Sequence, residues 1–98
     1  MGAERQPAVY MMANRRNGTI YVGVTSDLVR RVAQHRDGGG AGFAARYGCR
    51  MLVWFEMWGS MEGAIVREKA IKAGSRRGKL ALIEQGNPDW RDLGMGLV

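Results

Sequence analysis

The sequence contains few of the residues that build disulfide networks or multi-histidine metal centres. Its 98 residues include one cysteine and one histidine. Because Cys49 alone cannot form an internal disulfide, the composition fits a reducing compartment. Because His35 is the only histidine, a metal site made of several histidines is excluded.

Long apolar segments are also absent from the sequence. No stretch approaches the roughly 20 consecutive apolar residues that a membrane-spanning helix requires. Residues 1–7 lack the apolar run of a secretory signal and lead directly into a strand-like segment. We therefore expect a cytoplasmic protein without a membrane partner.

Positive charge is what the sequence has in excess. Fifteen lysine and arginine residues against nine acidic residues give a formal net charge of +6. A surface of this sign attracts polyanions, and nucleic acid is the leading candidate. A soluble basic protein without such a partner would have a similar composition.

The chain length favours one domain of the α/β (α+β) class. Ninety-eight residues, 46% of them apolar, can bury one core but not two, and the sequence has no internal repeat or linker. Apolar periodicity and turn residues predict strands at 8–13, 19–25 and 51–58, and helices at 28–36, from 61 to 71 and at 75–85. Gly38 to Gly40 should end the first helix. We expect a single domain over residues 1–98, with its core at 8–90 and a loose glycine-rich tail.

Two tyrosines lie in the first two predicted strands, which form a hairpin around the Asn17-Gly18 turn. If Tyr10 and Tyr21 point to the same face, their hydroxyls can converge on one phosphate and one water. Taken singly, each tyrosine is more typical of strand packing. A phenol with a pKa near 10 is also a poor base unless a nearby cation stabilises its phenolate.

A basic helix follows the hairpin. Arg31 and His35 are spaced i, i+4 and therefore share one face of this helix, where they can hold a phosphate. The arginine fork matches phosphate oxygens and can neutralise charge that develops in a phosphoryl transition state. The alternative is a solvated basic helix, which suits Arg30 and Arg36 better than Arg31.

Glu68 falls on the apolar stripe of the helix that begins near residue 61. An unpaired carboxylate there would cost several kcal/mol to bury, on the order of the penalty for a desolvated ion, so we expect a compensating cation. One answer is Mg²⁺, which often uses one or two protein carboxylates and completes its shell with water and phosphate. The other is a salt bridge to Lys72 at i+4.

Further basic residues follow Glu68 in the sequence. As phosphate contacts they would bind without reading sequence, and otherwise they are the solvated sides of two helices. The candidate contacts to nucleic acid are Arg30, Arg46, Lys69, Lys72, Arg76 and Arg77.

The order and spacing of these residues resemble the GIY-YIG nuclease superfamily from about Ala8 to Asn87. The two halves of the motif correspond to Val9-Tyr10 and Tyr21-Val22-Gly23. The chain looks most like the small stand-alone bacterial members (UPF0213 type), particularly in the segments 17–25, 43–48 and 87–90. It departs from the motif at Ala8, where the family has glycine.

The resemblance implies a fold, an activity and a set of roles. The fold would be a three-stranded antiparallel sheet flanked by helices, and the activity would be hydrolysis of phosphodiesters with one divalent metal, Mg²⁺ or Mn²⁺. Glu68 matches the metal-holding glutamate, and Arg31 matches the essential arginine. The remaining catalytic positions match Tyr10, Tyr21, His35 and Asn87, although Asn87 alone reads as a helix-ending residue.

Two functional hypotheses follow. The first is a metal-dependent endonuclease acting on DNA with low sequence specificity, or directed by substrate structure or by a protein partner. The second is a basic module that binds nucleic acid without turnover. Glycine at positions 74 and 78, where related small proteins often carry tryptophan, leads us to expect a last helix that is interrupted or less firmly packed.

Overall fold

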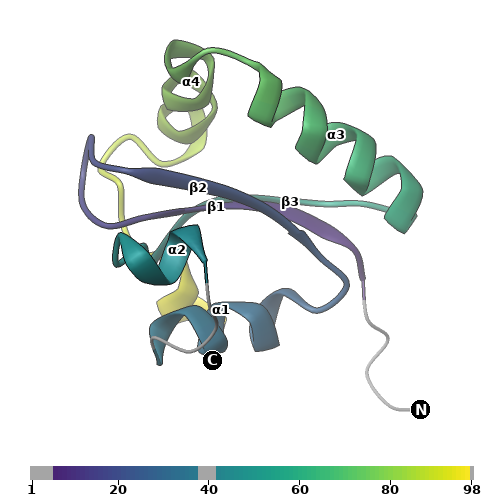
Figure 1. Ribbon diagram of the computed structural model, residues 1–98, viewed down its shortest axis with the longest axis horizontal. Coiled ribbons are helices and arrows are strands. Elements are labelled where there is room, and N and C mark those ends of the chain that lie inside the picture. The colour runs from purple at the N-terminus through teal and green to yellow at the C-terminus, as the bar shows by residue number, and fades with distance from the viewer. Residues whose placement is uncertain (1–5, 38–41, 98) are drawn as a thin grey trace.

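A three-stranded antiparallel sheet forms the centre of the computed structural model, which describes residues 6–37 and 42–97. Its order is β2-β1-β3, with β1 at Ala8–Ala13, β2 at Ile20–Thr25 and β3 at Met51–Met57. Helices α3 (Met61–Ala73) and α4 (Arg76–Gly86) lie on one face, and α1 (Leu28–Arg36) and α2 (Phe43–Arg46) lie on the other (Figure 1). The predicted α+β fold is confirmed.

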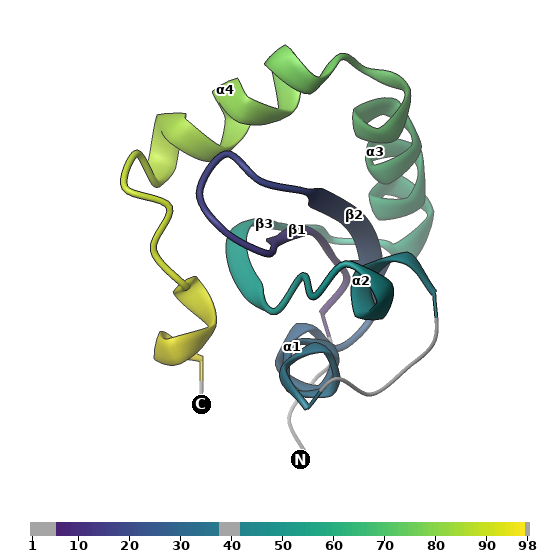
Figure 2. The same ribbon diagram turned by 60° about the vertical axis from the view of Figure 1, so that its left-hand side comes forward.

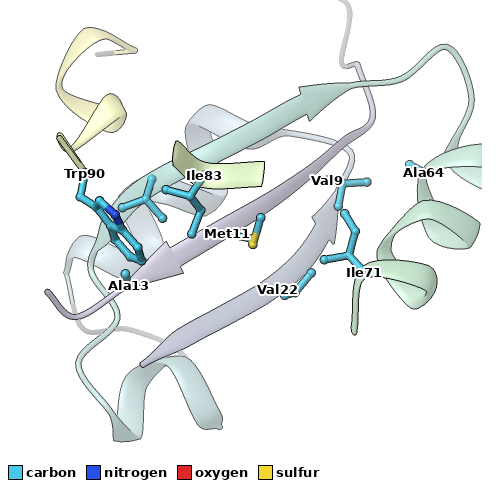
Figure 3. Packing of buried hydrophobic residues seen from close by; sticks show 9 residues of the cluster. Val9, Met11, Ala13, Val22, Ala64, Ile71, Ile83 and Trp90 are labelled. Atoms are coloured by element: carbon cyan, nitrogen blue, oxygen red, sulfur yellow. The ribbon is translucent and has the colours of Figure 1, made fainter. Parts of the chain in front are cut away.

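The central strand β1 is buried on both faces, which explains why its sequence is a continuous apolar run rather than an alternation. Val9, Met11 and Ala13 point toward α3 and α4, where they pack with Ile71 and Ile83, among others (Figure 3). The intervening residues point toward α1 and α2. Tyr10 is therefore on the α1 side of the sheet, and it is fully buried.

Side-chain caps begin the three longer helices. Asp27 accepts a hydrogen bond from the Arg30 amide at the start of α1. Ser60 accepts a bond from the Gly63 amide at 3.1 Å at the start of α3, and Ser75 accepts one from the Gly78 amide at 3.0 Å at the start of α4. These bonds satisfy amide donors that a helix start would otherwise leave unpaired, so the caps fix where each helix enters the sheet layer.

The two glycines do not interrupt the last helix. Gly74 is the C-cap of α3, in an extended conformation, and so separates α3 from α4. Gly78 lies in the first turn of α4, where its amide donates to Ser75. Helix α4 is continuous over Arg76–Gly86. The expected interruption is wrong because one glycine lies between the helices and the other is held by a cap.

The segment after Trp90 is not loose, contrary to our expectation. A 3-10 helix, η1 (Leu93–Gly96), packs beside α1 on the same side of the sheet (Figure 2). Asp92 holds it there by accepting bonds from the amides of Leu52 and Gly94 and by pairing with Arg36 at 2.6 Å. One carboxylate thus joins the tail to β3 and α1.

Two further expectations concern the end of the first helix and a membrane-spanning segment. Gly38 to Gly40, expected to end the first helix, lie outside the described residues, although α1 ends at Arg36 with Asp37 as its C-cap. Among residues 6–37 and 42–97, no helix has the length and apolar character needed to cross a bilayer.

Candidate active site

Three aromatic side chains meet on the α1 face of the sheet. The ring centroids of Tyr10 and Tyr21 are 6.1 Å apart, and the His35 ring lies 5.7 Å from Tyr10 and 5.5 Å from Tyr21. The Tyr10 hydroxyl and His35 Nε2 are 3.0 Å apart, a hydrogen-bonding distance. The hairpin and α1 therefore bring together the two tyrosines and the histidine that the sequence singled out.

Gly23 makes room for this cluster. It is the partner of Tyr10 in the β1–β2 register, and the Tyr10 ring lies across it. A Cβ atom at Gly23 would come within 2.5 Å of Tyr10 Cζ and Oη, closer than any real contact. The glycine of the second half-motif is thus required by the path of the Tyr10 ring across β2.

Arg31 and His35 face this cluster from one side of α1. Burial, and then the positive charge of Arg31, lower the pKa of His35 below its ordinary value of 6.5. His35 is therefore a neutral imidazole at neutral pH. Both Arg31 and His35 are partly buried, as expected for residues that line a site rather than coat a solvated helix.

The pKa of Tyr10 is raised above its ordinary value of 10.0. Burial is the largest cause, and the neighbouring Tyr21 adds to it. Arg31, through its charge and a side-chain hydrogen bond, acts in the opposite direction without reversing the shift. Tyr10 therefore keeps its proton, and the hydrogen bond between its hydroxyl and Nε2 joins it to a neutral imidazole.

Glu68 lies on α3, which packs on the face of the sheet opposite to α1. Its side chain is 10% exposed, and Lys72 pairs with it at 2.7 Å between Nζ and Oε2. The Lys72 ammonium also lies 5.9 Å from the centroid of the Tyr21 ring. The salt bridge that we considered as one compensation for Glu68 is present, and it places this carboxylate near the β2 edge of the tyrosine cluster.

Glu68 offers a divalent cation one protein carboxylate. The described residues contain no group of three or more histidine, cysteine, aspartate or glutamate side chains that could surround a metal. They do place one buried carboxylate against a cation, Lys72, which shows that this position accommodates positive charge. Such a site suits Mg²⁺ or Mn²⁺ only if water and phosphate supply the remaining ligands.

Asn87 is not brought to the cluster. It is buried beside β3, at the opposite edge of the sheet from β2, and its side chain donates to the carbonyls of Val53 and Arg91. Its Oδ1 accepts a bond from the Arg91 amide. These bonds use both ends of the amide to join β3 to the chain after α4, which is a structural role.

The basic residues proposed to contact nucleic acid divide into two groups. Arg76 donates to the carbonyls of Asn17 and Gly18, both at 2.8 Å, so it ties the hairpin turn to α4, and Lys72 is paired with Glu68. The second group consists of Arg30, Arg46, Lys69 and Arg77, whose side chains are exposed, as are those of Arg76 and Lys72. Arg30 and Arg31 also line a polar pocket of about 260 Å³ at the start of α1.

The sequence reasoning missed the groove on the outer side of β2. It has a volume of about 300 Å³ and is lined by Ile20, Tyr21, Val22, Lys72 and Lys79. Lys79 donates to the carbonyls of Lys72 and Gly74, at 3.5 and 2.9 Å. The seven-residue spacing of the two lysines was visible in the sequence, but the turn between α3 and α4 that brings them together was not.

Comparison with known proteins identifies the family and the fold of this chain. Residues 6–81 match the GIY-YIG catalytic domain. The chain therefore belongs to the GIY-YIG family, whose members are nucleases and act on nucleic acid.

Within this family the chain is similar to UPF0213 proteins. One from Pseudomonas aeruginosa is 39% identical over 87 residues, which cover 89% of this chain and 82% of the relative. Another, from Staphylococcus saprophyticus, is 35% identical over 71 residues, which cover 72% and 87%. The solution NMR structure of a UPF0213 protein from Bacillus halodurans has a TM-score of 0.55 at 30% identity and covers 89% of this chain and 92% of its own.

Proposed function

We propose that this protein is a divalent-metal-dependent endonuclease that hydrolyses phosphodiester bonds in DNA. The observation that supports this best is the 3.0 Å hydrogen bond between Tyr10 and His35, within a cluster that also contains Tyr21 and Arg31. It connects phenol groups to a neutral proton acceptor next to a cation that can hold a phosphate.

The proton of the attacking water leaves through this cluster. Tyr10 is fully buried, so water meets the cluster at Tyr21, which is only partly buried. As Tyr21 accepts a proton from water, it passes its own proton to Tyr10, and Tyr10 passes its proton to Nε2 of His35. Both phenols stay neutral, and the imidazole, the group with the pKa closest to neutrality, becomes protonated.

Arg31 holds the phosphate during this step. Its guanidinium interacts with Tyr10 and His35, so a phosphate bound to it lies within reach of the tyrosine cluster. Neighbouring phosphates of the same strand fit the polar pocket that Arg31 shares with Arg30. Phosphate contacts of this kind set position and not sequence, so sequence specificity is low, and substrate structure or a protein partner selects the target.

Glu68 is the residue that would hold the metal ion, Mg²⁺ or Mn²⁺. When bound, such an ion supplies Lewis-acid polarisation of the scissile phosphate. The chain contributes the charge and the fixed position of the carboxylate on α3.

The test is cleavage of labelled duplex, flap, branched and single-stranded DNA, with matching RNA, in Mg²⁺ and in Mn²⁺. We expect the wild-type protein to cut at least one DNA substrate, and Glu68→Ala to lose cleavage by about 10³-fold or more while binding is retained. Glu62→Ala is the matched control, because Glu62 is an exposed acid on the same helix. This control should cleave like the wild type.

Two results would contradict the proposal. Salt-sensitive binding without cleavage of any substrate would favour a nucleic-acid binding module. Equal cleavage by the wild type and Glu68→Ala would remove Glu68 from the chemistry.

A further inference from the structure

Lys72 occupies a position that the proposed chemistry does not explain. Its ammonium pairs with Glu68 at 2.7 Å, although the Lys72 side chain is 51% exposed and the Glu68 side chain only 10%. Glu68 is the only buried carboxylate among residues 6–37 and 42–97. A surface cation thus reaches inward to neutralise the single buried acid in this part of the chain.

The same ammonium lies beside the tyrosine cluster. It is 5.9 Å from the Tyr21 ring centroid and lines the groove of about 300 Å³ along β2. Lys79 lines this groove too, and its bonds to the carbonyls at the end of α3 keep it in place. Lys72 therefore stands between the carboxylate of Glu68 and a groove that already carries a second positive charge.

We propose that Lys72 and a divalent cation exclude each other on Glu68, and that Lys72 moves into the β2 groove to contact a substrate phosphate when the metal binds. This inference rests on the proposed function. It makes Lys72 a positioning residue: it holds the Glu68 side chain in place while no metal is present, and it adds positive charge beside Tyr21 when the metal is bound.

Electrostatics explains the exclusion. An ammonium 2.7 Å from a carboxylate oxygen takes the space of a metal ion at that oxygen, since Mg²⁺ binds at 2.0–2.1 Å. A metal ion and the Lys72 ammonium bound to the same carboxylate would repel each other strongly where solvent is limited. Lysine has a flexible four-carbon stem, so its half-exposed head can relocate without disturbing the helix.

The exchange couples metal binding to substrate binding. Without metal, the charges of Glu68 and Lys72 cancel, and Lys79 is the remaining positive charge of the groove. With metal on Glu68, the released Lys72 ammonium would add its charge to that of Lys79 in the groove, which favours a phosphate there. By linkage, a polyanion in the groove must increase metal affinity by the same factor by which metal increases affinity for the polyanion.

The experiment measures Mn²⁺ affinity without nucleic acid, by electron paramagnetic resonance of free Mn²⁺. We expect Lys72→Met to bind Mn²⁺ about fivefold more tightly than the wild type, because the competing ammonium is gone. Lys69→Met is the matched control: it removes an exposed lysine of the same helix, changes the net charge equally and leaves the pair intact. Its Mn²⁺ affinity should stay within about twofold of the wild type.

The outcomes separate this inference from the proposed function. If Lys72→Met and Lys69→Met shift the affinity equally, or if Lys72→Met weakens binding, the exclusion is wrong. If the wild type and Glu68→Gln bind Mn²⁺ equally, Glu68 is not the metal ligand, and the proposed function fails with it.

A second measurement does not depend on a variant that folds. In the wild type, titration with Mg²⁺ should shift the carbon NMR signal of Lys72 Cε, because the ammonium leaves the carboxylate. The Lys69 signal should not move. A Lys72 signal that stays unchanged at saturating Mg²⁺ would overturn the inference.

Discussion

His35 is the residue at which the proposed proton transfer ends, so its ionisation should set the acid side of the pH profile. Burial and the charge of Arg31 lower its pKa below 6.5, so the imidazole stays neutral at pH 7 and is protonated only at lower pH. We therefore expect kcat/KM to decline on the acid side with a midpoint below pH 6.5. Initial rates across pH 5 to 8 provide the check.

A matched substitution assigns this acid limb to the histidine. His35→Gln keeps a polar side chain but cannot accept a proton, so it should lower kcat by about 10²-fold and remove the limb. An acid limb with its midpoint above 6.5, or one that persists in His35→Gln, would show that another group titrates.

Among the structural elements, the C-terminal segment depends most on one side chain. Asp92 accepts the Leu52 amide at 3.1 Å and the Gly94 amide at 3.0 Å, and it pairs with Arg36. Asp92→Ala would leave the strand amide and the guanidinium without this acceptor, so we expect a loss of about 1–3 kcal/mol in the free energy of unfolding. Urea unfolding followed by circular dichroism measures it.

The control for this element is another aspartate near the C-terminus. Asp89 pairs with Arg91 at 3.9 Å, and both side chains are largely exposed. Asp89→Ala should change the free energy of unfolding by less than about 0.5 kcal/mol. Equal losses for the two variants would mean that Asp92 does not fix the tail.

The order of the C-terminal segment could not be predicted from local sequence patterns. Strand β1 and helix α1 have the bounds that local patterns predicted, because apolar runs, caps and turns act over a few residues. The order of the tail comes instead from Asp92 bonding to residues 40 and 56 positions earlier. No local pattern carries such contacts, and the same is true of Arg76, which bonds the hairpin turn 59 positions away.

The residues of the candidate site were easier to predict than the order of the C-terminal segment, because the family motif relates residues that are far apart in the sequence. The resemblance assigned both Tyr10 and His35, which are 25 residues apart, to the site, and a hydrogen bond joins them in the structure. The same resemblance suggested Asn87, which bonds to β3 and the chain after α4. A motif conveys that positions recur together, but it does not distinguish a residue that reacts from one that supports the fold.

For the whole molecule, the net charge of +6 should make binding to DNA strongly dependent on salt. The logarithm of the binding constant should fall linearly with the logarithm of salt concentration, and replacing one phosphate-contacting arginine should reduce the slope by about 1. We expect this for Arg30→Ala, because Arg30 is exposed and lines the polar pocket at the start of α1. Fluorescence anisotropy of labelled DNA between 50 and 200 mM salt measures these slopes.

Arg76→Ala separates charge from contact in the same titration. It removes the same formal charge, but Arg76 donates to the carbonyls of Asn17 and Gly18 and is held at the hairpin turn. We expect it to leave the salt slope unchanged and to lower stability instead, because two carbonyls lose a charged donor. Equal slope changes for Arg30→Ala and Arg76→Ala would mean that net charge alone governs binding, and that the pocket beside Arg31 does not direct the strand to the tyrosine cluster.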